Sequence, residues 1–377
     1  MEGNSMTMLR ERIKRACALM EKHGLDVIIL TNPANMFYLT GDGRLCAYAM
    51  VTREGKVAVG VPQTDIEDVK GKATFDDIVG FEDEVGMIHS LAHNFKRFGI
   101  QKGTLGLEYA FLPKPRIGML THPHGKPGAV GVKDCTAMMS ELRLVKDDAE
   151  IVRLQAAARV ADAGMGAAVR SIKVGMTESQ IAAEAEYTMR YAGADDFYKS
   201  YVASGPRTNI AHGIPTRRKI EQGDLIMIDL HPVVDGYTAD LCRTVCIDVP
   251  TEAQQKAFDL YVQALKATIS KAKAGVEMAA LEKTMHDLFT TAGHKDHIFG
   301  PPIHGVGIQF EEAPLPAGHA FFHGEEPPLP LVAGVVIAIG NCGLYTGLWG
   351  VREEDTVVIG AEKPLVLTNY PYFLKRK

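Results

Sequence analysis

The stretch DLIMIDLHPVVDGYTADLCRT, residues 224–244, has the pattern of two β-strands joined by a hairpin. The first apolar run ends in Asp229, the second strand contains Asp240, and the residues between them are hairpin-like. Aspartates on neighbouring strands could face each other, and paired buried carboxylates repel unless a cation lies between them or one binds a proton. The alternative is two exposed carboxylates, one of them paired with Arg243. These residues alone leave both interpretations open.

Three further residues are candidates for the same site. His304 is flanked by glycine and proline in a tight segment, Glu354 lies at the start of a C-terminal strand, and His212 lies on a Gly/Pro-containing loop. A lone histidine is more often structural, and acidic residues at a strand start are usually solvated. Taken together with the aspartates, however, these side chains suit Mn²⁺, Co²⁺, Zn²⁺ or Fe²⁺. Two such ions about 3.5–4 Å apart can hold a hydroxide that attacks a carbonyl.

Outside this region the N-terminal part of the chain alternates helix and strand. Residues 6–24 have helical apolar spacing ending at a glycine, residues 26–30 form a β-branched strand, and Asn32-Pro33 is a typical helix start. A passage rich in proline and glycine, residues 113–131, is typical of a linker or long loop. Residues 146–169 then have the pattern of a long helix.

The most informative feature of the organisation is a repeat. Residues 173–196 resemble residues 273–296, an offset of 100, and each copy has a glycine turn, an amphipathic helix and a glycine stop. Capping-box patterns begin helices at Thr177 and Thr251. One interpretation is chance similarity between amphipathic helices. The other is a duplicated α/β half, with helices packed on one face of a shared antiparallel sheet.

Composition excludes several classes of protein. The 377 residues suggest two or three domains, and 46% hydrophobic with 23% charged residues is an ordinary soluble composition. A net charge of −5 argues against nucleic acid as a partner, and no apolar run is long enough for a membrane span. The N-terminus is polar and unlike a signal peptide. Six sparse cysteines predict reduced thiols and a cytoplasmic protein.

The ordered motifs resemble the pita-bread metallohydrolases, a family that includes prolidase, aminopeptidase P, methionine aminopeptidase and creatinase. Residues 1–135, notably NPANMFYLTG at 32–41, are similar to the creatinase/prolidase N-terminal domain. Residues 146–377 are similar to the catalytic domain. The resemblance implies an α+β fold whose catalytic domain has two pseudo-symmetric α/β halves, and this agrees with the repeat.

The resemblance also implies roles for single residues. Asp229 matches the first aspartate ligand of the family, Asp240 the aspartate that bridges both metals, His304 the histidine ligand and Glu354 the last, bridging glutamate. His212 matches the loop histidine that contacts substrate. Glu354 would also accept a proton. One or two divalent ions (Mn, Co, Zn or Fe) are implied, and a metal-free site is possible because creatinase has none.

Three departures from the family pattern bear on the site. The usual Ile-Glu-Pro-Gly-Ile-Tyr motif is replaced by residues 338–345, where the glutamate falls on Gly340 or on Asn341 depending on the register. Asn341 could offer a carbonyl oxygen and Cys342 a soft thiolate, but neither replaces a glutamate for Mn²⁺. Glu311 occupies the place of a histidine that supports substrate in the peptidases.

The third departure is His231, two residues after Asp229, where a small residue is usual. Alternate residues of a strand share a face, so we hypothesise that His231 supplies a substitute metal ligand. The alternative is a histidine at the sheet edge with no metal contact. Cys242 and Cys246 also share a face, and we interpret them as small core residues rather than soft ligands.

The leading functional hypothesis is a metal-dependent hydrolase resembling Xaa-Pro dipeptidase or aminopeptidase, in which a metal-bound hydroxide attacks an amide carbonyl. The alternative is a non-peptidase enzyme that cleaves a small-molecule C–N or C–S bond, as creatinase and the dimethylsulfoniopropionate lyases of this fold do. A binding module without catalysis is a third class. A short peptide or small molecule is the expected partner, and the resemblance implies a homodimer.

Overall fold

The computed structural model describes residues 2–109, 130–315 and 331–375. The chain folds into two compact units, Met1–Arg143 and Leu144–Lys377. The division between the units falls at the last residue of helix α6 (Thr136–Leu144), in the interval that the sequence leaves between its two predicted domains. No helix in the described ranges combines the length and apolar character needed to cross a bilayer.

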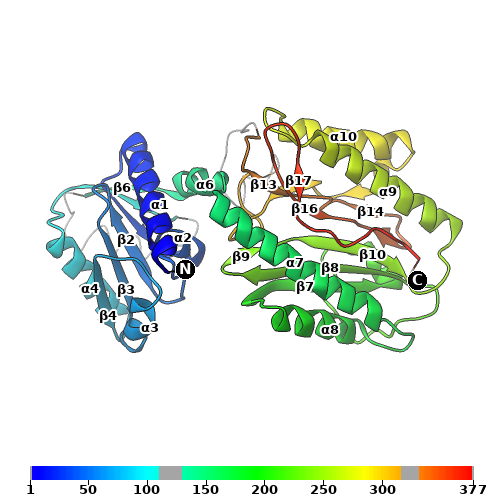
Figure 1. Cartoon of the computed structure of the whole chain (residues 1–377), viewed down its shortest axis with the longest axis horizontal. Coiled ribbons are helices and arrows are strands. Elements are labelled where there is room, and N and C mark those ends of the chain that lie inside the picture. Colours follow the sequence, from blue (N-terminus) through cyan, green and yellow to red (C-terminus); the bar gives the residue numbers. More distant parts are fainter. Residues whose placement is uncertain (1, 110–129, 316–330, 376–377) are drawn as a thin grey trace. The chain divides into compact units, whose positions relative to one another are not determined.

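The N-terminal unit is built on one six-stranded mixed sheet with the order β4-β3-β2-β1-β5-β6 (Figure 1). The predicted helix ends are confirmed, because Gly24 adopts a left-handed φ of 65° after α1 and the Asn32 side chain accepts the Ala34 N–H at 3.0 Å. Its elements are α1 (Glu2–His23), β1 (Val27–Leu30), α2 (Pro33–Thr40), β2 (Tyr48–Thr52), β3 (Val57–Pro62), α3 (Ile66–Lys70), β4 (Asp77–Phe81), α4 (Glu84–Arg97), β5 (Gly103–Leu107) and β6 (Val130–Asp134).

The predicted linker of residues 113–131 lies almost wholly outside the described residues. At its C-terminal end the prediction is wrong, because Gly131 lies on β6 and pairs with Thr104 of β5. A glycine inside a strand weakens the strand pattern, and that is why sequence reasoning extended the loop too far.

The C-terminal unit contains two pairs of long helices and three antiparallel sheets. Helix α7 begins two residues later than predicted because Asp147 is its N-cap, closed by a capping box with Glu150. The elements are α7 (Asp148–Ser171), α8 (Glu178–Tyr191), β7 (Asp196–Ser204), β8 (Leu225–Val234), β9 (Tyr237–Thr238), β10 (Leu241–Cys246), α9 (Glu252–Lys271), α10 (Met278–Thr291), β11 (Ile298–Phe299), β12 (Ile303–Gly305), β13 (Val336–Ile339), β14 (Gly343–Tyr345), β15 (Gly350–Val351), β16 (Asp355–Val358) and β17 (Leu365–Val366).

The repeat seen in the sequence has a structural counterpart. Helices α8 and α10 begin and end 100 residues apart, and the glycines that precede them, Gly175 and Gly275, have φ values of 87° and 84°. Each copy pairs with the long helix before it, α7 with α8 and α9 with α10 (Figure 1). Both predicted capping boxes, at Thr177 and Thr251, are present.

Strands from the two halves of the C-terminal unit come together beside the candidate residues. The first half contributes β10-β8-β7 with β9 beside β8, and the second contributes β12-β13-β16-β17. An antiparallel bridge between Cys242 and Glu354 joins them, with N···O distances of 3.3 and 3.0 Å. The candidate residues of the sequence analysis lie on both sides of this bridge.

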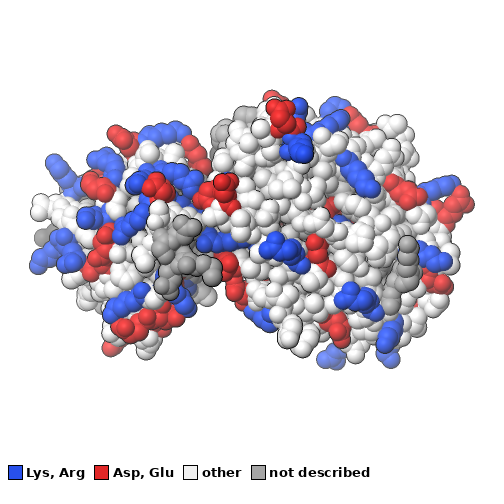
Figure 2. Space-filling view, in the orientation of Figure 1, with Lys and Arg blue, Asp and Glu red and all other residues white. Residues whose placement is uncertain are grey.

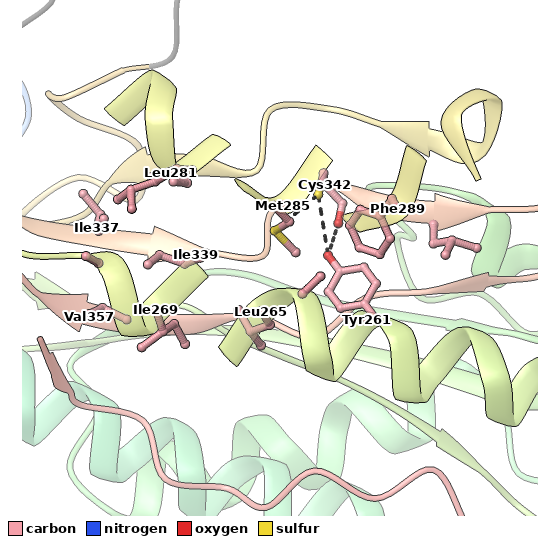
Figure 3. Packing of buried hydrophobic residues seen from close by; sticks show 14 of the residues in the cluster. Tyr261, Leu265, Ile269, Leu281, Met285, Phe289, Ile337, Ile339, Cys342 and Val357 are labelled. Carbon is pink, nitrogen blue, oxygen red and sulfur yellow. Dashed lines mark hydrogen bonds between the residues drawn. The ribbon is translucent and has the colours of Figure 1, made fainter. Parts of the chain in front are cut away.

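The core of the second half fixes the loop that follows β13 (Figure 3). The buried Tyr261 hydroxyl of α9 donates to the carbonyl oxygen of Gly340 at 2.7 Å and also contacts that of Cys342. The Cys342 thiol lies 4.0 Å from the sulfur of Met285 on α10. Burial raises the pKa of Cys342 to about 12. These contacts place the Cys342 thiol in the hydrophobic core of the second half.

On the face displayed in Figure 2, acidic and basic side chains of the described residues alternate. Cys242 and Cys246 are both fully buried on β10.

We predict that Tyr261→Phe destabilises the protein by about 1–3 kcal/mol, because two buried carbonyl oxygens lose their hydrogen-bond donor. Urea unfolding would measure the change. Tyr191→Phe is the matched control, since Tyr191 is 85% exposed, and it should leave the free energy of unfolding unaltered. Equal stability of the two variants would contradict the anchoring role of Tyr261.

Candidate metal centre

A two-residue turn sets the register of the central hairpin. Asp235 and Gly236 both have positive φ, 48° and 78°, as a type I′ turn requires. Strand β8 runs on to Val234, which pairs with Tyr237, so the predicted hairpin loop is shorter than expected. Pairing then continues through to Leu230 opposite Leu241, and this register puts His231 opposite Asp240.

Asp229 lies two residues before His231 and shares its face of the sheet. The His231 Nε2 atom is 3.2 Å from Asp229 Oδ1 and 3.3 Å from Asp240 Oδ1. All three residues are buried, with at most 2% of their surface exposed. The alternative of two exposed aspartates is therefore wrong, whereas metal binding by His231 stays a prediction.

The second half of the unit brings two more side chains to Asp240. His304 on β12 places Nε2 3.3 Å from Asp240 Oδ2 and 3.7 Å from Glu354 Oε1. Glu354 precedes β16 and is held beside β10 by its bridge to Cys242. Two groups of three potential ligands result, Asp229–His231–Asp240 and Asp240–His304–Glu354, and they share Asp240.

Both imidazoles are oriented by backbone carbonyls. His231 Nδ1 is 2.7 Å from the carbonyl oxygen of Lys199, and His304 Nδ1 is 3.1 Å from that of Gly305. A carbonyl can only accept, so each Nδ1 carries the proton and each Nε2 of a neutral ring presents a lone pair to the carboxylates. Metal-binding histidines in proteins are commonly held in this way.

The cluster leaves buried polar atoms without hydrogen-bond partners. They are Asp229 Oδ1, His231 Nε2, both Asp240 carboxylate oxygens, His304 Nε2 and both Glu354 carboxylate oxygens. Such atoms are costly to bury unless something binds them. The set is oxygen-rich with two imidazole nitrogens and suits a divalent Mn, Fe, Co or Zn ion, so the residues present fit the metal that the sequence predicts.

The electrostatics of the cluster show how strongly it attracts positive charge. Burial and then the Asp240 carboxylate raise the pKa of Glu354 to about 8, against the opposing effect of Arg352. Burial disfavours charged His304, but Asp240 outweighs this and raises its pKa to about 9. Burial also disfavours charged His231, and Asp229 with Asp240 reverses the effect so that its pKa is raised. Protons and divalent cations therefore compete for these side chains.

Arg352 is a member of the site that sequence reasoning missed. Its Nη2 contacts Asp229 Oδ2 directly and lies 3.3 Å from Glu354 Oε2, while Nη1 donates to the carbonyl of Ala211 at 3.2 Å. The guanidinium is buried and fixes one oxygen of each carboxylate, so that the other oxygen faces the cluster. Its position two residues before Glu354 is the one clue in the sequence, and this position does not indicate the contact with Asp229.

The backbone at position 340 leaves no room for the glutamate of the usual Ile-Glu-Pro-Gly-Ile-Tyr motif. Gly340 has a φ of 117°, and a Cβ there would lie 2.0 Å from the carbonyl oxygen of Glu353. No side chain fits at this position without moving the backbone. Asn341 is half-buried and its N–H donates to Pro302 at 3.2 Å. A ligand role for Asn341 stays a prediction.

His212 and Glu311 lie beside the cluster rather than within it. His212 is exposed, and its ring is 5.5 Å from that of Tyr201. Glu311 is half-buried, and its charge is among those that raise the pKa of His304. Sequence analysis also missed an aromatic wall, in which Phe310 lies 4.3 Å from the His231 ring and stacks on Tyr198 at 4.8 Å.

Two family models and several known proteins match this chain. Residues 152–361 match the model of metallopeptidase family M24, and residues 12–145 match that of the creatinase/prolidase N-terminal domain. A Xaa-Pro dipeptidase of Pyrococcus furiosus is 27% identical over 353 residues, covering 93% of this chain and 95% of that protein.

Solved structures agree with these matches. The prolidase of Pyrococcus horikoshii superimposes with a TM-score of 0.84 at 26% identity, over 97% of this chain and 99% of that one. A Xaa-Pro dipeptidase from Bacillus anthracis gives 0.86 at 25% identity, with the same coverage. The predicted pita-bread α+β fold is confirmed.

We predict that Gly340→Ala destabilises the protein by about 1–3 kcal/mol more than Gly347→Ala, because only the first adds a clash to the strain of positive φ. Gly347 has a φ of 86° and open space around its Cβ position, so it isolates the strain. Urea unfolding would measure both. The clash with the Glu353 backbone should also lower metal uptake through the adjacent Glu354, measured by elemental analysis. Identical behaviour of the two variants would show that position 340 tolerates a side chain.

Proposed function

Because this chain belongs to metallopeptidase family M24, we propose that it hydrolyses short peptides of the Xaa-Pro type, as a dipeptidase. The observation that carries the proposal is the buried group of Asp229, Asp240, His304 and Glu354, with lone pairs converging on shared positions. The matches to both the N-terminal and the catalytic family models support the same assignment for the whole chain.

Asp229, Asp240, His304 and Glu354 would hold one or two divalent ions. Bound there, the metal would polarise the scissile carbonyl and lower the pKa of a water molecule. Glu354, whose carboxylate faces the same cluster, would accept a proton from that water and pass it to the leaving amine nitrogen. Arg352 keeps the carboxylates of Asp229 and Glu354 aligned.

Residues around the cluster would position the substrate. His212 is exposed on its loop beside Tyr201 and steadies the substrate from the open side. Glu311 is half-buried near His304 and suits an ammonium or amide N–H rather than a carboxylate. The rings of Phe310, Tyr198 and Tyr201 offer apolar faces against which a proline ring packs.

The non-peptidase alternative rests on two substitutions, Gly340 for a glutamate and Glu311 for a histidine. The relatives favour the peptidase, because several that cover nearly the whole chain carry the names Xaa-Pro dipeptidase and prolidase. The buried ligand group also argues against a pure binding module.

We expect purified protein loaded with Mn²⁺, Co²⁺, Zn²⁺ or Fe²⁺ to release proline from at least one member of a Xaa-Pro dipeptide panel. Glu354→Gln, which keeps shape but removes the proton acceptor, should lower kcat by at least about 100-fold. Glu362→Gln, on an exposed loop, is the matched control and should retain full activity. If none of the dipeptides is hydrolysed with any of the metals, the proposal is overturned and the non-peptidase alternative is favoured.

Metal removal should destabilise the protein, because the buried carboxylates lose the charge that balances them. Adding metal at 100 times its Kd should raise the free energy of unfolding by about 2.7 kcal/mol. Thermal unfolding with chelator and with each metal would measure this. A melting temperature indifferent to metal would indicate a creatinase-like, metal-free site.

We also propose that the protein is cytoplasmic and forms a homodimer. All six cysteines are free thiols, which supports a reducing compartment. The dimer follows from the family resemblance, and sedimentation equilibrium would test it through the measured mass, since the monomer has 41.0 kDa.

A further inference from the structure

The metal centre has lost a ligand at one position and has a new donor at another. Ile339 pairs with Asp355 and Ile303, so the same register puts Gly340 next to Glu354 and Pro302. Position 340 thus lies beside the cluster, where a glutamate would add a carboxylate, but glycine contributes no ligand. The positive φ and the contact with Glu353 keep any side chain from this place.

We propose that His231 is a metal ligand that completes an ion position with Asp229 and Asp240, and so compensates at that position for the carboxylate lost beside Glu354. The centre then has two positions, each with one imidazole, and Asp240 is shared between them. The inference rests on the metal dependence of the proposed function, but not on the identity of its substrate.

The His231 ring is fixed in the orientation that a ligand needs. It is 0% exposed, its Nδ1 is bonded to the Lys199 carbonyl at 2.7 Å, and Nε2 has no hydrogen-bond partner. Phe310 approaches its ring edge-on at 4.3 Å, and Tyr201 does so from another side at 5.7 Å. Because the ring is held at Nδ1 and by two aromatic neighbours, Nε2 stays directed between the carboxylates.

The second donors of this position are equally constrained. Asp229 uses Oδ2 for Arg352, which leaves Oδ1 for the cation, and this oxygen is 3.2 Å from His231 Nε2. Asp240 directs Oδ1 to His231 and Oδ2 to His304. Each of the two ion positions therefore receives one oxygen of the Asp240 carboxylate.

Exchanging a carboxylate for an imidazole changes which metal binds best. Carboxylate-rich sites suit Mn²⁺, whereas imidazole favours the later ions Co²⁺, Ni²⁺ and Zn²⁺. With one imidazole in each position, the protein should bind Co²⁺ and Zn²⁺ well in preference to Mn²⁺. The competing arrangement is a protonated His231 that itself balances Asp229 and Asp240, with a metal only at the His304 position.

The test is metal binding by purified full-length protein, stripped with chelator and titrated with Co²⁺. Elemental analysis gives the number of ions, and visible absorption reports nitrogen ligation. Wild type should bind two ions per chain. His231→Gln should keep one and lose the other, with affinity at that position lower by at least about tenfold. His212→Gln, an exposed histidine beside the same Tyr201, is the matched control and should bind two.

A second variant distinguishes loss of a ligand from misfolding of His231→Gln. His231→Glu supplies a carboxylate of similar reach, so it should restore the second ion and raise the affinity for Mn²⁺ relative to Co²⁺ by at least about tenfold. Circular dichroism would confirm that each variant is folded.

Three results would overturn the inference. His231→Gln could bind two ions with unchanged affinity, or wild type could bind a single ion that His231→Gln also binds. The third is a His231→Glu variant whose affinity for Mn²⁺ relative to Co²⁺ equals that of wild type. Two ions in wild type without dipeptide hydrolysis would instead overturn only the proposed substrate.

Discussion

The mutual repulsion of three buried carboxylates is the constraint around which the catalytic unit is organised. Asp229, Asp240 and Glu354 converge from two halves of the chain with almost no exposed surface. Among the described residues, only Arg352 brings a permanent positive charge directly to two of them. Burial of that much negative charge is tolerated only where cations or protons are bound. The aromatic wall and the hydrogen-bonded imidazoles maintain the geometry in which those cations fit.

Much of this arrangement was predictable from local sequence. Helix caps at Asn32, Thr177 and Thr251 follow from side-chain hydrogen bonds within one turn, and the structure has all three. The spacing of Asp229 and Asp240 left open whether they face each other, and the structure brings both against His231. The pair Asp235-Gly236 is also informative, because it favours a type I′ turn. Such a turn fixes the register of the hairpin and so puts His231 opposite Asp240.

Other features depend on contacts between distant segments and leave little trace in the sequence. Arg352 reaches Asp229 across 123 residues, and no local pattern announces that contact. Cys342 looked like a possible ligand, but Tyr261 on α9 and Met285 on α10 hold it in the core. The strand-side and turn-side registers at residues 340–341 could not be separated until the positive φ of Gly340 showed where the strand ends.

The charge of the centre explains why its departures from the family pattern occur together. Loss of a glutamate at position 340 removes one negative charge, and a neutral His231 does not restore it. Glu311 stands where the peptidases carry a histidine, and its charge acts on His304. The site therefore has four carboxylates, as it would with the usual glutamate, but one has moved from the ligand group to its rim. Two divalent ions, bound as proposed, would still be balanced by four negative charges, and His231 would supply an imidazole in direct contact with metal. A substrate approaching the rim meets a negative group in place of an imidazole, so the same exchange that preserves the charge of the metal centre alters the surface that faces the substrate.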